Sequence, residues 1–126
     1  MSIRVALPVH DHKGLDDHIF EHFGHAPAFL IINVSEGKII DLKTVDNAYM
    51  DGHAPGAVPS FLAELGVNVL ICREVGRRAL LFFEQLGIEV VRGAGGRVRD
   101  VIEEYLSGRL KSRDYEPSRK WHEEHS

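Results

Sequence analysis

The sequence predicts an α/β domain in which an early antiparallel hairpin is followed by alternating strands and helices. Ile3, Val5 and Leu7 alternate with Arg4 and Ala6, which predicts a first strand. An apolar run over residues 29–34, interrupted by Asn33 alone, is followed by a turn and a second β-like run over residues 39–45, which predicts the hairpin. From residue 58 onward, helical and strand-like patterns alternate, so we expect the later strands to be parallel and joined by helices.

Each element is expected from its periodicity and from the residue that ends it. The first strand ends at Pro8, and residues 9–27 are irregular except for a short helix expected near residues 15–22. Glycines follow each of the later helical patterns, as is common at helix C-termini. These patterns predict a helix over 58–65, a strand over 67–72, a helix over 79–86, a strand over 88–91 and a helix over 98–105.

The composition is that of one globular domain with a polar extension. The 126 residues are 44% hydrophobic and 27% charged, with a net charge of −4, which argues against a generic nucleic-acid or membrane binder. We expect a domain over residues 1–108 and a flexible or loosely docked tail over residues 109–126, where apolar periodicity is nearly absent. No leader pattern and no long apolar run are seen, so a cytoplasmic location is expected.

Positive charge is concentrated in two glycine-containing loops that each follow a predicted strand. Parallel strands place such loops at the same carboxyl edge of a sheet, where open α/β sheets bind ligands. Backbone N–H groups, helix N-termini and guanidinium groups all favour an anion, so this edge is predicted to hold a small, highly charged anion. The loops contain six of the ten Lys and Arg residues among the first 107 positions: Arg73, Arg77 and Arg78 around Gly76, and Arg92, Arg97 and Arg99 around Gly93, Gly95 and Gly96.

Histidines and the single cysteine are candidate metal ligands. His18 and His22 are four residues apart, so the helix expected near residues 15–22 would place both on one face, with His25 in the loop that follows. Imidazole suits iron, copper, zinc and nickel alike. Solvated surface histidines are the alternative interpretation.

Cys72 ends a predicted strand directly before Arg73, and two interpretations remain open for it. Arg73 and a helix N-terminus could lower the pKa of its thiol and make it a ligand or a reactive group. Otherwise it is a small buried hydrophobic residue. As the only cysteine, it excludes an internal disulfide and a Cys-x-x-Cys motif.

Several catalytic signatures are absent from the sequence. There is no nucleophile elbow, no Walker A loop and no Gly-x-Gly-x-x-Gly fingerprint. The predicted strand ends carry arginine instead of the clustered acids that a magnesium-dependent nuclease needs. These observations argue against the common hydrolase and nucleotide-binding classes.

Four segments resemble the dinitrogenase iron–molybdenum cofactor-binding family, and the similarity covers residues 1 to about 107. This family includes NifX, NafY, the C-terminal part of NifB and the orange protein. The most specific segments match a Glu-His-Phe-Gly-x-Ala-Pro-x-Phe pattern and a His-x-Pro-Gly pattern. In order, the four segments are residues 3–9 (IRVALPV), 21–29 (EHFGHAPAF), 53–58 (HAPGAV) and 65–71 (LGVNVLI).

The resemblance implies a fold, a role and a set of ligand residues. It implies a three-layer α/β/α sandwich with a ribonuclease-H-like motif and a five-stranded mixed sheet with one antiparallel strand. The implied role is non-catalytic binding or carrying of an anionic metal–sulfur cluster that contains molybdenum with iron or copper. By matching positions, His22 and His53 are the first candidate metal ligands, followed by Cys72 and His25, and Gly24 and Gly56 join Arg73, Gly76, Arg77, Arg92, Gly95, Gly96 and Arg97 as candidate cofactor-binding residues.

Two positions depart from the family pattern. Many members have Gly-Gly-Ile-Gly where this chain has Arg73-Glu74-Val75-Gly76, and many have arginine at the position of His25. The first change makes the loop bulkier and more polar, and the second keeps a hydrogen-bond donor while adding a ligand atom.

The sequence is therefore compatible with three functions. The first is a carrier or accessory protein for a metal–sulfur cluster, with cluster-assembly or acceptor proteins as partners and with no nucleic acid or membrane. The second is a regulatory or partner-binding module that uses the tail as its contact. The third is a metal-dependent hydrolase built on the ribonuclease-H-like sheet.

Overall fold

The computed structural model describes residues 2–50, 54 and 56–110 as five strands, three α-helices and two short 3₁₀ turns. Each predicted strand of the sequence and each later helix is present, with ends shifted by one or two residues. In chain order the elements are β1 (Ser2–Val9), η1 (Gly14–Asp16), η2 (Phe23–His25), β2 (Ala28–Ser35), β3 (Lys38–Asp46), α1 (Ala57–Glu64), β4 (Val69–Ile71), α2 (Arg77–Leu86), β5 (Glu89–Val91) and α3 (Val98–Leu106).

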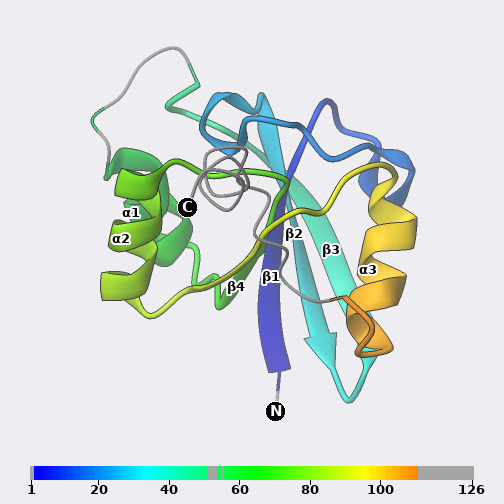
Figure 1. The fold of residues 1–126 in the computed structure, drawn as a ribbon. Coiled ribbons are helices and arrows are strands. Elements are labelled where there is room, and N and C mark those ends of the chain that lie inside the picture. The colour runs from blue at the N-terminus through cyan, green and yellow to red at the C-terminus, as the bar shows by residue number, and fades with distance from the viewer. Residues whose placement is uncertain (1, 51–53, 55, 111–126) are drawn as a thin grey trace, which may run out of the picture.

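The strands form one mixed sheet in the order β3-β2-β1-β4-β5. Strand β2 is antiparallel to both β1 and β3, whereas β1, β4 and β5 are parallel to one another. Helices α1 and α2 lie on one side of the sheet and α3 lies on the other (Figure 1). The three-layer sandwich with one antiparallel strand in a five-stranded sheet is thereby confirmed.

Alternate side chains of the central strands enter two separate cores. Val5 and Leu7 of β1 pack toward α3, where they meet residues such as Val98, and both strand residues are fully buried. Ala6 lies on the opposite face, in the core that Leu62 of α1 and Phe83 of α2 complete. Because β2 is also buried on both faces over most of its length, its sequence from residue 28 to 32 is uniformly apolar instead of alternating.

The short helix expected near residues 15–22 is wrong. The chain instead forms two 3₁₀ turns, η1 and η2, separated by extended backbone in which His18 and Ile19 form isolated bridges to Arg97 and Val9. The physical reason is that the backbone N–H groups of Ile19 and Phe20, which a helix would bond four residues back, donate instead to the distant carbonyl oxygens of Gly96 and Pro8. His18 and His22 therefore do not share a helix face.

Most of the predicted tail lies outside the described residues, which end at Leu110. The described part of it stays close to α3, because the backbone N–H groups of Arg109 and Leu110 both donate to the carbonyl oxygen of Glu104. Leu110 also packs against the α3-side core. The domain boundary at residue 108 stays a prediction.

Candidate anion-binding site at the carboxyl edge of the sheet

The two arginine- and glycine-containing stretches lie side by side where β4 and β5 end. We call residues 73–78 the first basic loop and residues 92–99 the second. The backbone N–H of Gly93 donates to the carbonyl oxygen of Arg73 at 2.8 Å, and that of Ala94 donates to Cys72 at 3.1 Å. A Cβ atom on Gly95 would lie only 2.9 Å from Nη1 of Arg73, so the guanidinium packs directly over this glycine. The prediction that parallel strands bring both loops to one edge is therefore met by direct contacts.

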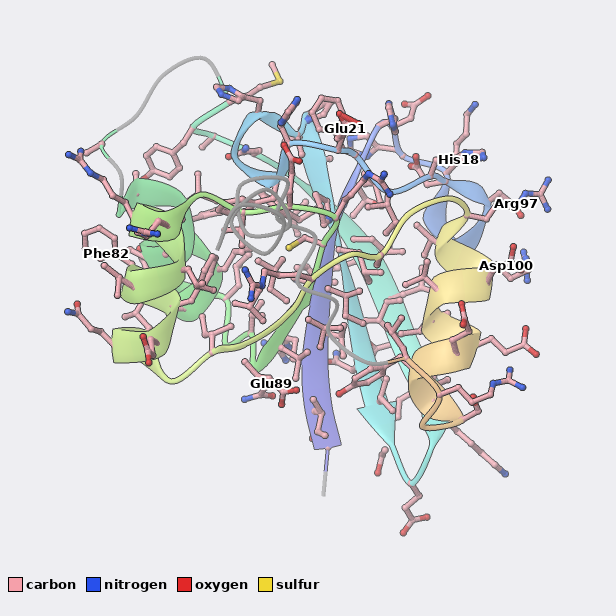
Figure 2. The ribbon with its side chains drawn as sticks, in the orientation of Figure 1. His18, Glu21, Phe82, Glu89, Arg97 and Asp100 are labelled. Atoms are coloured by element: carbon pink, nitrogen blue, oxygen red, sulfur yellow. The ribbon has the colours of Figure 1, made fainter. Side chains whose placement is uncertain are left out.

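Residues 17–22, which we call the crossing segment, run over this edge and connect both loops with the end of β1. The N–H of Ile19 donates to the carbonyl of Gly96 at 2.9 Å, and the N–H of Phe20 donates to that of Pro8 at 2.8 Å. His18 forms an antiparallel bridge with Arg97, and both residues lie at the upper edge in Figure 2. The crossing segment thus fixes the backbone of the second basic loop relative to the central strand.

Asp17 organises the start of the crossing segment, and sequence reasoning missed it. Its buried carboxylate accepts backbone N–H groups through Oδ1 from His10 at 3.2 Å and His18 at 3.0 Å, and through Oδ2 from Asp11 at 3.2 Å and Lys13 at 3.1 Å. Burial alone would raise the pKa of Asp17, but these hydrogen bonds outweigh it and hold the pKa below its usual value. An aspartate within an irregular, histidine-rich stretch is the signal that could have indicated this role.

A network of charged side chains lies over the first basic loop. Nδ1 of His22 lies 2.8 Å from Oε1 of Glu74, while Nε2 lies 3.7 Å from Oε2 of Glu21. Nε of Arg73 is 4.0 Å from the other oxygen of Glu21. Each imidazole nitrogen therefore faces a different carboxylate, and an incoming anion would compete with these carboxylates for Arg73 and His22.

The remaining arginines differ in what surrounds them. Arg77 and Arg97 are exposed, and Arg77 begins α2 directly after the exposed Gly76. Arg99 donates to Asp16 at 2.9 Å, a pairing that raises the pKa of Arg99 and lowers that of Asp16. Arg92 points toward α2, where it lines a hollow of about 340 Å³ together with Leu80, Glu84, Ile88, Glu89 and Val90.

Gly96 in the second basic loop has a φ of 89°, a conformation that side chains rarely adopt. Its carbonyl oxygen is the group that accepts from Ile19. Glycine at this position therefore allows the backbone conformation in which the loop bonds to the crossing segment. It also leaves unoccupied space beside the loop.

Cys72 is fully buried, and burial raises the pKa of its thiol to about 12 against a smaller lowering by Arg92. The expectation of a lowered pKa is wrong, and the alternative of a small buried hydrophobic residue describes its environment. The local charge pattern misled because the thiol points into the core beneath α1 and α2. Its role as a metal ligand stays a prediction that requires this region to open.

The structure describes two of the three candidate histidine ligands, His22 and His25. His22 and His25 are exposed beside η2, and His53 lies outside the described residues. Among residues 2–50, 54 and 56–110, no three His, Cys, Asp or Glu side chains converge in a way that could hold a metal ion. The anion-binding role of this edge and the histidine ligands both stay predictions.

The glycines of the two most specific motifs have packing roles. The buried amide of Asn47 donates through Nδ2 to the carbonyl oxygens of Gly24 at 3.3 Å and Ala26 at 2.9 Å, which ties the η2 turn to the end of β3. A Cβ on Gly56 would lie 2.9 Å from Cε1 of Phe82, so this glycine allows α2 to approach the start of α1. Asn47 is a second residue that sequence reasoning missed.

Comparison with known proteins identifies the family. The family model described as dinitrogenase iron-molybdenum cofactor matches residues 1–108. The chain belongs to this family. The resemblance seen in the motifs of the sequence is thereby confirmed, and the family is named for the cofactor of dinitrogenase.

Solved structures of similar proteins share the fold of this family member. The protein PH0822 is 31% identical, with a TM-score of 0.81, over 90% of this chain and 98% of its own. A putative NifB protein from Thermotoga is 32% identical, with a TM-score of 0.72, over 87% of this chain and 92% of its own. The apo form of the orange protein from Desulfovibrio gigas is 26% identical, with a TM-score of 0.77, over 88% of this chain and 92% of its own.

Within the part of the chain that the structure describes, no helix of this family member is long and apolar enough to cross a bilayer.

Proposed function

We propose that this protein binds an anionic metal–sulfur cluster at the carboxyl edge of its sheet and acts as a non-catalytic carrier or accessory protein. The observation that carries the proposal is the joining of two arginine- and glycine-containing loops by backbone hydrogen bonds at one edge, with Arg73 packed over Gly95. The family name points to the same class of ligand. Molybdenum with iron or copper is the metal content that the sequence resemblance implies.

The cluster is cargo, and the chain holds it mainly by charge and hydrogen bonding. Arg77 and Arg97 supply exposed guanidinium groups. Open space around Gly76 and Gly96 leaves room for close approach of an anion to the backbone. Glu21 and Glu74 lie beside Arg73 and His22, so cluster binding exchanges carboxylate contacts for contacts with sulfide or oxide. His22 and His25 are accessible imidazoles that could add a direct metal bond.

The experiment is anaerobic uptake of thiomolybdate or of a cluster extract by the untagged protein, followed by metal and sulfide analysis and a visible spectrum. We expect stoichiometric metal and sulfide with charge-transfer absorption. The Arg77→Ala/Arg97→Ala double variant should retain the cluster at least about tenfold less tightly, because it loses two charge-assisted contacts.

Lys38→Ala/Lys43→Ala is the matched control, since it removes the same charge from exposed positions on β3. Circular dichroism confirms that all variants are folded. Unchanged retention in the arginine variant, or an equal loss in the lysine variant, would remove the case for an anion site at this edge.

A further inference from the structure

Helix α2 carries a stripe of four exposed side chains on the side that faces solvent, with the apolar Leu81 and Phe82 at its centre. Arg78, Leu81, Phe82 and Gln85 follow an i, i+3, i+4, i+7 spacing and line a shallow groove of about 170 Å³. Leu81 is 53% exposed and Phe82 is 37% exposed, whereas Phe83 on the inner side is fully buried. Figure 2 shows Phe82 on the outer side of α2, away from the sheet.

The charges that flank this stripe are arranged with opposite signs at its two ends. Arg77 and Glu84 are two helical turns apart on the same side of α2, roughly 10 Å along the axis, too far to pair within the helix. Neither of them forms an ion pair with another residue in the described part of the chain. The basic end and the acidic end of the stripe are thus both available to an outside partner.

We propose that a second copy of this chain covers this face, with the two α2 helices antiparallel about a two-fold axis between Leu81 and Phe82. Such an axis places Leu81 of one copy against Phe82 of the other, and Arg78 against Gln85. On the flank, Arg77 approaches Glu84 of the second copy, and symmetry forms this pair twice. A helix whose charges reverse about the centre of its exposed stripe is self-complementary, as an isologous contact requires.

The contact is small, because one helix from each copy supplies most of it. Interfaces of that size lie at the low end of the range for specific association. We therefore expect a monomer–dimer equilibrium with a dissociation constant of roughly 100 µM, instead of an obligate dimer. The dimer uses the Arg77 guanidinium that the proposed function assigns to the cluster, so it is tested on protein without a cluster.

The test is sedimentation velocity of the untagged full-length chain between about 10 µM and 1 mM, a range that brackets the expected dissociation constant. Leu81→Glu should raise the dissociation constant at least tenfold. Ile40→Glu is the matched control, because Ile40 is 59% exposed on the edge strand β3 and its replacement makes the same chemical change. The control should associate as the wild type does.

Charge reversal tests the orientation of the two helices. Glu84→Arg should weaken association by placing like charges together, and Arg77→Glu/Glu84→Arg should restore it by exchanging both partners. A wild-type chain that stays monomeric at the highest concentration would leave this face to a different protein and overturn the proposal. Sensitivity to Ile40→Glu but not to Leu81→Glu, or no rescue by the double reversal, would equally overturn it.

Discussion

Asparagine in place of Asp17 keeps the shape of the side chain and removes its charge. One carboxylate oxygen becomes an NH₂ group, which cannot accept hydrogen bonds. Each oxygen of Asp17 accepts two backbone N–H groups, so the substitution places the new NH₂ group against two backbone N–H groups that lose their acceptor. Asp17 is only 2% exposed, so water cannot easily replace that acceptor. We expect the loop around residues 10–18 to lose its fixed conformation.

The cost follows from the number of bonds that change. A hydrogen bond to a charged group contributes about 1.5–3 kcal/mol net, and a buried unsatisfied donor costs about 1–3 kcal/mol. Two hydrogen bonds to the carboxylate are lost, and the other two become hydrogen bonds to a neutral amide oxygen. The variant no longer buries a negative charge, which offsets part of the loss. We expect the free energy of unfolding to fall by about 2–4 kcal/mol at pH 7.

Urea unfolding measures the global part of this loss, and amide hydrogen exchange of residues 10–18 measures local opening. Asp11→Asn is the control, because Asp11 is exposed in the same loop and, among the described residues, its side chain accepts only the N–H of His12. A loss below about 0.5 kcal/mol, with exchange unchanged from the control, would refute the reasoning.

The pH dependence has a definite sign. The folded-state pKa of Asp17 is lower than its unfolded value of about 3.9, so its contribution is fully present above that value. The contribution disappears as the pH falls through the folded-state pKa. The difference in stability between wild type and Asp17→Asn should therefore be constant from about pH 5 to 8 and shrink below about pH 4.

Two further predictions concern buried or crowded positions. Burial raises the pKa of the Cys72 thiol to about 12, so we expect a disulfide reagent at pH 8 to label the native protein far more slowly than urea-unfolded protein. One thiol per chain should react after unfolding. Rapid labelling of the native protein would contradict the buried position. Gly56→Ala should lower the free energy of unfolding by about 1 kcal/mol, because the added Cβ would crowd the Phe82 ring. In a Phe82→Ala background this loss should largely vanish. An equal loss in both backgrounds would show that the contact is not the cause.

The fold could be predicted because its elements are encoded locally. The apolar run of β2, the turn before β3 and the glycine-ended helices each leave a pattern within a few residues of sequence. The meeting of the two basic loops followed from topology alone, since parallel strands present their carboxyl ends at one edge. The glycines at 95 and 96 stand where these contacts require them.

The crossing segment could not be predicted because its partners are distant in sequence. Residues 15–22 have a helix-compatible pattern, but Asp17 binds backbone N–H groups of its own loop and His18 pairs with Arg97. The pairing of His22 with Glu74 likewise leaves no periodic signal. For Cys72, the packing of two helices decides the environment of the thiol, and neighbouring charge does not reveal that packing.

The crossing segment also sets an order of events during synthesis of the chain. Strand β1 lies between β2 and β4, and the segment that follows it completes its hydrogen bonds only with Gly96 and Val98, near the end of the domain. A nascent chain that has released only its first half can therefore form the hairpin, but it lacks both loops of the edge. Long-range closure of this kind slows folding relative to local pairing. Any ligand that needs the complete edge consequently meets it only after the second basic loop and the first residue of α3 have left the ribosome.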